Sequence, residues 1–260
     1  MLIRQFVILL LLSVNFTLLG QDYQNNHLNL LVLLVDEDYE KCLKKSLKIT
    51  DQQETRKQPL PYLYASMAYF QMSRDSEFRS DYPKAFKSSI SYLGKYRRKD
   101  PSFEYKEDAL KFIEKIKFIL AENIENNKLL YEEEKAEKKN KSIYKKIAKM
   151  DPNDFSIEVL KGVSEYKSAS KSAARKVLKE NVPYLDSISK PEKFETLTES
   201  QQYFYKKALI SYAKFVEEKE PEEAKRILNL GKKYFIDENS LILLPDNSDF
   251  KKAYNSLISN

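Results

Sequence analysis

A short spacing of large, small and aromatic residues returns three times along the chain and restricts what it can fold into. The copies are Tyr62-x2-Ala65-Ser66-x2-Tyr69, Val159-x2-Gly162-Val163-x2-Tyr166 and Tyr205-x2-Ala208-Leu209-x2-Tyr212. Steps of three and four residues place these side chains on one face of an α-helix. The small residues in the middle of each copy let a second helix approach closely. The chain is therefore predicted to be all-α and built from helices that pack side by side.

The composition agrees with a folded helical protein. Only 4 Gly and 9 Pro leave few residues for β-hairpin turns, and a hydrophobic fraction of 42% is ordinary for a folded chain. The 45 basic and 39 acidic residues give a net charge of +6, but the two signs are interspersed. Because nucleic-acid-binding proteins usually cluster basic residues on one face, we expect a solvated helical surface and no nucleic-acid partner.

A second spacing alternates with the first, and two of its copies end on proline. It reads Ser89-x3-Leu93-x2-Tyr96-x4-Pro101 and Asn140-x3-Tyr144-x2-Ile147-x4-Pro152, with a partial copy Ala224-x3-Leu228-x2-Gly231. Together the two spacings resemble the two helices of a tetratricopeptide repeat. The run Pro-Tyr-Leu-Tyr-Ala-Ser-Met-Ala-Tyr-Phe at 61–70, together with a basic and apolar N-terminus (Arg4, then Phe6 to Leu12), also resembles small exported repeat proteins of Bacteroidota. The resemblance implies a right-handed solenoid of stacked antiparallel helical hairpins. The sequence departs from the repeat pattern at two places: residues are inserted after Tyr69, and Ile236 stands where a proline is expected.

The first twenty residues have the form of a secretory signal peptide. Arg4 supplies a short basic start, an unbroken apolar run follows from Phe6 to Leu12, and Gly20 precedes polar residues. The apolar stretch is short for a membrane helix, which needs about 20 apolar residues, so cleavage after Gly20 leaves no stable membrane span. Leu18 is larger than the residue usual at that position, which keeps an uncleaved anchor as the alternative. We expect an exported protein, periplasmic or secreted.

These patterns divide the chain into four segments. The signal peptide at 1–20 is followed at 21–58 by a helical hairpin, with helices at 28–34 and 39–49, and a polar connector. Residues 59–240 form the repeat solenoid. Residues 241–260 form a capping segment, with a short helix over Phe250, Tyr254 and Leu257.

Within the solenoid the helical periodicity predicts several further elements. We expect helices at 61–72, 83–98, 103–125, 167–185 and 199–218, and one that starts at Pro221. A long loop is predicted over 71–82, and another between Pro183 and Pro191.

No set of residues predicts catalysis, a cofactor or a metal. Cys42 and His27 are the single cysteine and the single histidine, whereas zinc sites of this type need three or four such ligands. The four glycines are scattered singly, so the sequence holds no glycine-rich phosphate loop. Asp151-Pro152-Asn153-Asp154 lacks the glycine and the later glutamate of a calcium loop, and a helix-ending turn is predicted there.

The resemblance implies that side chains of the first helix of each repeat line a concave groove for an extended peptide or a partner helix. The candidates are Leu60, Leu63, Met67 and Phe70 in one repeat and Tyr203, Lys206, Ile210 and Lys214 in another. Lys206 and Lys214 suit a carboxylate or another anion. The alternative is that the apolar members pack in the core and the lysines are ordinary surface.

Three functions follow as hypotheses. The leading one is a non-enzymatic protein–protein interaction scaffold, or adaptor, of the bacterial envelope. A glycan or cell-wall binding module is the alternative, because the 18 tyrosines offer rings that stack on sugars. The third is a glycan-active enzyme on a helical fold. Exposed rows of tyrosine would favour the second, and two buried carboxylates that converge in a deep cleft would favour the third.

Overall fold

The computed structural model describes residues 27–168, 171–236 and 247–258. The chain is helical through these ranges, which contain no strand, so the predicted all-α class is confirmed. The predicted signal peptide lies outside them, as do Leu241 and Pro245 at the start of the predicted capping segment.

Two compact units divide the chain, Met1–Ala109 and Leu110–Asn260, called here the N-terminal and the C-terminal unit. The boundaries predicted from sequence follow residues 58 and 240. The division in the structure falls after Ala109, near the start of helix α5 (Lys106–Leu130).

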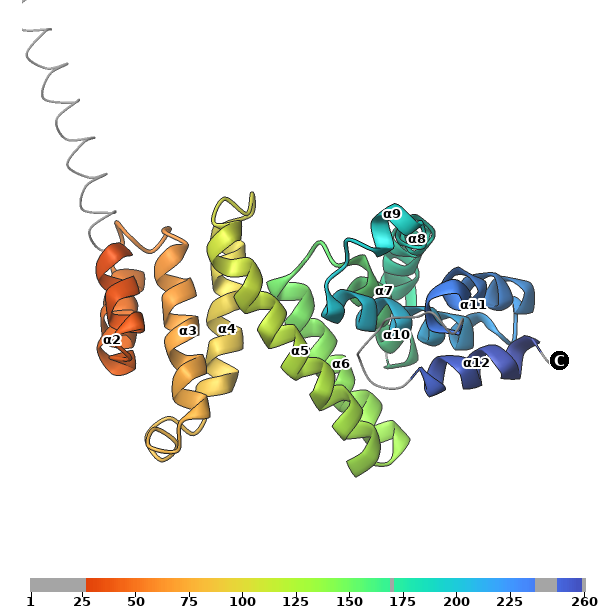
Figure 1. Cartoon of the computed structure of the whole chain (residues 1–260), viewed down its shortest axis with the longest axis horizontal. Helices are drawn as coiled ribbons and strands as arrows, with labels where there is room; N and C mark the ends of the chain where they lie inside the picture. Colours follow the sequence, from red (N-terminus) through yellow and green to blue (C-terminus); the bar gives the residue numbers. More distant parts are fainter. Residues whose placement is uncertain (1–26, 169–170, 237–246, 259–260) are drawn as a thin grey trace, which may run out of the picture. The chain divides into compact units, whose positions relative to one another are not determined.

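Successive helices of the N-terminal unit pack against each other. Residues 27–35 are helical, and α2 (Tyr39–Asp51), α3 (Leu60–Arg74) and α4 (Ala85–Lys99) follow. The helices α3 and α4 run side by side in opposite directions (Figure 1). Where they meet, the Ser66 hydroxyl donates to the Ser89 carbonyl at 2.7 Å. Both serines occupy small positions of the two repeated spacings, so these spacings do mark a close helix pair.

The C-terminal unit is also a succession of helices. After α5 come α6 (Glu133–Met150), α7 (Phe155–Ser168), α8 (Lys171–Ile188), α9 (Pro191–Phe194), α10 (Glu199–Val216), α11 (Pro221–Phe235) and α12 (Ser248–Ile258). The helix α7 packs against α6, α8 and α10, and α11 packs against α10 and α12. At Gly162 a Cβ atom would lie 2.9 Å from Leu178 Cδ2, so the glycine of the second motif copy permits the close approach of α7 and α8.

Two of the predicted loops are corrected by the structure. Pro183 lies inside α8, because Val182 and Leu185 on either side of it are buried and hold the segment in the helix against the proline's low propensity. The chain leaves helical structure only around residues 189–190, before α9 begins at Pro191. The loop predicted over 71–82 starts later, since α3 continues to Arg74.

The short helix predicted near the C-terminus is confirmed. It is α12, in which Phe250 and Leu257 are buried and Tyr254 is half-buried. The start predicted at Pro221 is confirmed as well, with the proline in the first turn of α11 and acidic residues beside it.

Candidate functional site

The structure corrects the groove assignment for most of the side chains that the repeat pattern selected. A partner can touch a side chain only where solvent reaches it. Among the candidates, Met67 and Ile210 are half-buried and Lys214 is exposed. The others fill the spaces between packed helices and are buried: Leu60, Leu63, Phe70, Tyr203 and Lys206.

The buried polar members of that set bind other parts of the chain. The Tyr203 hydroxyl donates to Glu125 Oε1 at 2.5 Å, which links α10 to α5. Lys206 Nζ donates to Asn247 Oδ1 at 3.0 Å, just before α12 begins. Lys206 is therefore an internal contact of the fold, and the carboxylate nearest to its ammonium in the ion pairs, Asp249 at 3.9 Å, belongs to the chain itself.

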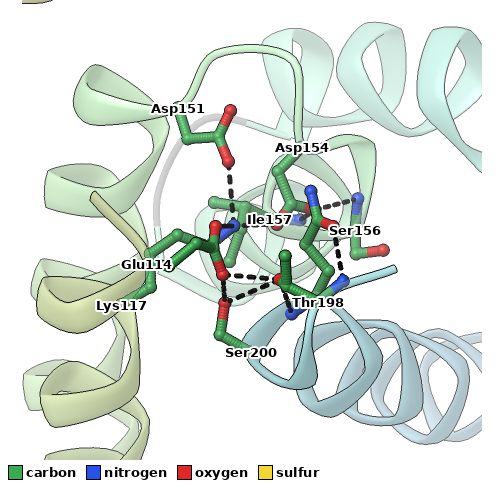
Figure 2. Close-up of polar contacts among 9 residues, drawn as sticks. Glu114, Lys117, Asp151, Asp154, Ser156, Ile157, Thr198 and Ser200 are labelled. Carbon is green, nitrogen blue, oxygen red and sulfur yellow. Dashed lines mark hydrogen bonds and ion pairs between the residues drawn. The ribbon is translucent and has the colours of Figure 1, made fainter. Parts of the chain in front are cut away.

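A buried lysine in α5 of the C-terminal unit lies among three carboxylates (Figure 2). The Lys117 side chain is 0% exposed. Its ammonium lies 2.8 Å from Asp151 Oδ2 and 3.0 Å from Asp154 Oδ2. Glu114, one turn earlier in α5, lies 3.3 Å from the same nitrogen. We call Glu114, Lys117, Asp151 and Asp154 the Lys117 cluster.

Helix ends supply hydrogen bonds to two carboxylates of the Lys117 cluster. Asp154 Oδ1 accepts from the backbone N–H groups of Ser156 at 3.1 Å and Ile157 at 3.4 Å, and so caps the start of α7. Glu114 Oε2 accepts from the hydroxyls of Thr198 and Ser200, each at 2.5 Å. Thr198 is also the N-cap of α10, where it forms a capping box with Gln201.

The charges of the cluster hold one another in place. Burial opposes the charge of Lys117, but Asp154, Asp151 and Glu114 outweigh it and raise the pKa of the ammonium above its usual value. Burial also raises the pKa of the Asp154 carboxyl, against the attraction of Lys117. The cluster therefore ties α5, the turn before α7 and the start of α10 together.

A cavity lined by lysines in the N-terminal unit is a candidate binding site. It has a volume of about 630 Å³ and lies between the helix of residues 27–35 and α2. Leu33 and Ile49 form its apolar lining, and Gln52 also lines it. Its basic lining is the set of lysines Lys41, Lys44, Lys45 and Lys48. We call this the α2 cavity.

The lysines of the α2 cavity differ in how they are neutralised. Lys41 pairs with Asp38 at 2.8 Å and Lys44 with Glu40 at 4.0 Å, both on the surface. For Lys45 and Lys48, the part of the chain that the structure describes contains no ion-pair partner. The cavity therefore carries positive charge that its own carboxylates do not cancel.

A second basic cavity, of about 380 Å³, lies where α2, α3 and α4 meet in the same unit. The rings of Tyr62 and Tyr92 stack 6.3 Å apart in its lining. Lys95 lies 4.0 Å above the Tyr92 ring, a cation–π distance. Tyr62 itself is buried, so these rings offer little free face for a sugar.

Exposed tyrosines are scarce over the described ranges. Tyr184 is the one tyrosine there that is exposed, and its ring stacks on Phe155 with centroids 3.8 Å apart. A row of coplanar exposed rings, which the glycan hypothesis calls for, is not formed by the tyrosines that the structure describes.

Comparisons with known proteins give no further guidance. No family model, no curated protein and no solved structure matches the chain. In the described ranges, none of the helices combines the length and the apolar character that crossing a bilayer requires. Over the same ranges, the His, Cys, Asp and Glu side chains form no group that could hold a metal ion.

The sequence analysis did not predict the α2 cavity or the Lys117 cluster, although the sequence contains a signal for each. The lysines of α2 recur at steps of three and four residues, which is the spacing of one helix face. Lys117 falls four residues after Ile113 and three before Leu120, which is the spacing of one helix face, and both of these residues are apolar. A lysine at such a position signals a buried charge that needs partners.

Proposed function

We propose that this protein is an exported, non-enzymatic interaction scaffold of the bacterial envelope, built from tetratricopeptide-like helical hairpins stacked as a solenoid. It binds an acidic, partly apolar segment of a protein partner in the α2 cavity. The α2 cavity, with its four lysines, is the observation that carries the proposal. The paired packing of α3 with α4, of α7 with α8 and of α10 with α11 supports the hairpin architecture.

The spacing of the lysines suits a peptide rather than a compact anion. From Lys41 to Lys48 is seven residues, or about 10 Å along the helix at 1.5 Å per residue. Alternate side chains of an extended peptide point the same way and lie roughly 7 Å apart. Two carboxylates of such a peptide reach Lys45 and Lys48, and an apolar side chain fits against Leu33 and Ile49.

Because exposed ion pairs are weak and are screened by salt, this binding is expected to be salt-sensitive. A fluorescein-labelled peptide of alternating glutamate and leucine is titrated with the chain from Gln21 onward, at 50 and at 300 mM salt. Fluorescence anisotropy reports binding. The charge reversal Lys45→Glu/Lys48→Glu should weaken binding at least tenfold, since it replaces attraction by repulsion at both sites.

A matched variant separates local from general charge effects. Lys176→Glu/Lys179→Glu reverses two exposed lysines of α8 and changes the net charge by the same amount. It should leave peptide binding nearly unchanged. Equal loss in both variants, or no loss in either, would show that the α2 cavity is not the binding site. Capture from envelope extracts with the same three proteins then identifies the natural partner.

A further inference from the structure

A different surface, in the C-terminal unit, already holds a helix. The short helix α12 packs against α10 and α11. Its buried side chains include Phe250, Ala253 and Leu257, at steps of three and four residues. The 11 residues of α12 are fewer than an isolated helix needs to be stable in water, so α12 depends on this contact for its form.

The contact contains a fitted space for an aromatic ring. A Cβ atom at Gly231 of α11 would lie 2.7 Å from Phe250 Cζ and 2.7 Å from Leu209 Cδ1. The Phe250 and Phe235 ring centroids lie 5.0 Å apart. The missing side chain at Gly231 therefore makes room for the ring of Phe250. We call Leu209, Gly231 and Phe235 the Phe250 socket.

Two buried lysines stand beside the socket and face an acid. Lys207 Nζ pairs with Asp249 Oδ2, and Lys206 Nζ lies 3.9 Å from Asp249 Oδ1. The Tyr254 hydroxyl donates to Asn229 Oδ1 at 2.9 Å further along α12. The face of α10 and α11 thus fits a helix with a defined pattern. The pattern is an acidic residue followed directly by an aromatic residue, with a small residue three positions and a leucine seven positions after the aromatic one.

We propose that this face is a binding site for an amphipathic partner helix, and that α12 fills it in cis as a built-in competitor. The partner helix carries the same acid–aromatic pair and takes the place of α12. Charge complementarity at Asp249 and the shape of the Phe250 socket define this occupant. The proposal concerns a surface other than the α2 cavity, and its test does not use that cavity.

The test uses the chain from Gln21 to its end and a labelled peptide of residues 247–258, read by fluorescence anisotropy. In the wild type, α12 competes with the peptide. In Phe250→Ala the competitor is weakened, so the peptide should bind at least tenfold more tightly than it binds the wild type. Lys252→Ala, on the exposed side of α12, is the control and should behave as the wild type does. A peptide that lacks the phenylalanine should not bind.

A second pair of variants tests the socket and guards against misfolding. In Gly231→Ala/Phe250→Ala, the space left by the ring accepts the new methyl group in cis, but the phenylalanine of the peptide is excluded. This double variant should lose the gained affinity while circular dichroism shows native helix content. Asp249→Lys releases α12 by charge instead of packing and should also increase peptide binding.

Three results would overturn the proposal. The first is a folded Phe250→Ala or Asp249→Lys chain that binds the peptide no more tightly than the wild type. The second is a socket variant that binds as well as its parent. The third is a wild-type dimer that Phe250→Ala dissociates, because it would assign the face to α12 of a second copy of the chain.

Discussion

Replacing Lys117 with methionine tests how much the Lys117 cluster stabilises the C-terminal unit. Methionine keeps much of the length and apolar volume of the side chain but removes the ammonium. Three carboxylates then lose their cation. Asp151 and Glu114 are 19% and 17% exposed and regain some water, whereas Asp154 is only 5% exposed and stays dry. The cost should therefore fall mainly on Asp154.

Removing one partner of a buried ion pair typically costs about 3–5 kcal/mol, because the other charge is left without compensation. With one carboxylate dry and two partly wet, we expect a value near the lower end, about 3 kcal/mol. For a unit of this size, such a loss lowers Tm by roughly 10 °C. Thermal unfolding followed by circular dichroism at 222 nm measures it. Lys176→Met, at a lysine that is 77% exposed, is the control and should leave Tm unchanged.

The pH dependence of the stability of Lys117→Met is a second test of the same reasoning. A carboxyl whose pKa is raised by folding stabilises the folded state as pH falls through that pKa, since the folded state then binds more protons. Without Lys117, the pKa of the Asp154 carboxyl should rise further, so Lys117→Met should regain stability relative to the wild type between pH 7 and pH 5. Adding Asp154→Asn, which removes the charge and keeps an oxygen for the cap of α7, should restore part of the loss at pH 7. A Lys117→Met protein as stable as the wild type at pH 7 would refute the reasoning.

Three other outcomes are expected. Burial opposes the charge of Glu125, but Lys207 and the hydrogen bond from Tyr203 lower its pKa from the usual 4.5 to about 2. The charged Glu125 side chain therefore stabilises the folded state above pH 4.5, and this stability is lost as pH falls through 2. After discounting for the partial exposure of Glu125, the contribution is about 1–2 kcal/mol. In urea unfolding, Glu125→Gln should be less stable than the wild type by this amount at pH 7 and equally stable near pH 2. Gly162→Val should lower the free energy of unfolding by about 1–3 kcal/mol in the same assay, because its side chain collides with Leu178. Burial raises the pKa of the Cys42 thiol to about 11, so a disulfide reagent at pH 8 should react with the native chain roughly 100-fold more slowly than with the urea-unfolded chain.

Periodicity in the sequence predicts a helix well where one face of that helix is buried along its whole length. Ser66 and Gly162 were identified by spacing alone, and each lies at a close approach of two helices. Pro183 shows the limit, because local propensity favours a break there and the burial of its neighbours overrides it.

The groove assignment shows a second limit. Counting residues from a motif gives the helix face on which Tyr203 and Lys206 lie, but not which other segment covers that face. In the structure α5 approaches Tyr203 and the start of α12 approaches Lys206, from 78 and 41 residues away in sequence. Coverage of this kind is set by tertiary packing and is not encoded in the periodicity of one helix.

The Lys117 cluster also imposes an order on the newly made chain. Glu114 and its hydroxyl partners Thr198 and Ser200 are 84 and 86 residues apart in sequence. While a chain is being synthesised, Lys117 stays hydrated until Asp151 and Asp154 have emerged, and Glu114 stays hydrated until the start of α10 has emerged. Hairpins with local contacts, such as α7 with α8, can form during this interval. The expulsion of water from around Lys117 is then a late event, one that requires most of the chain to have been made.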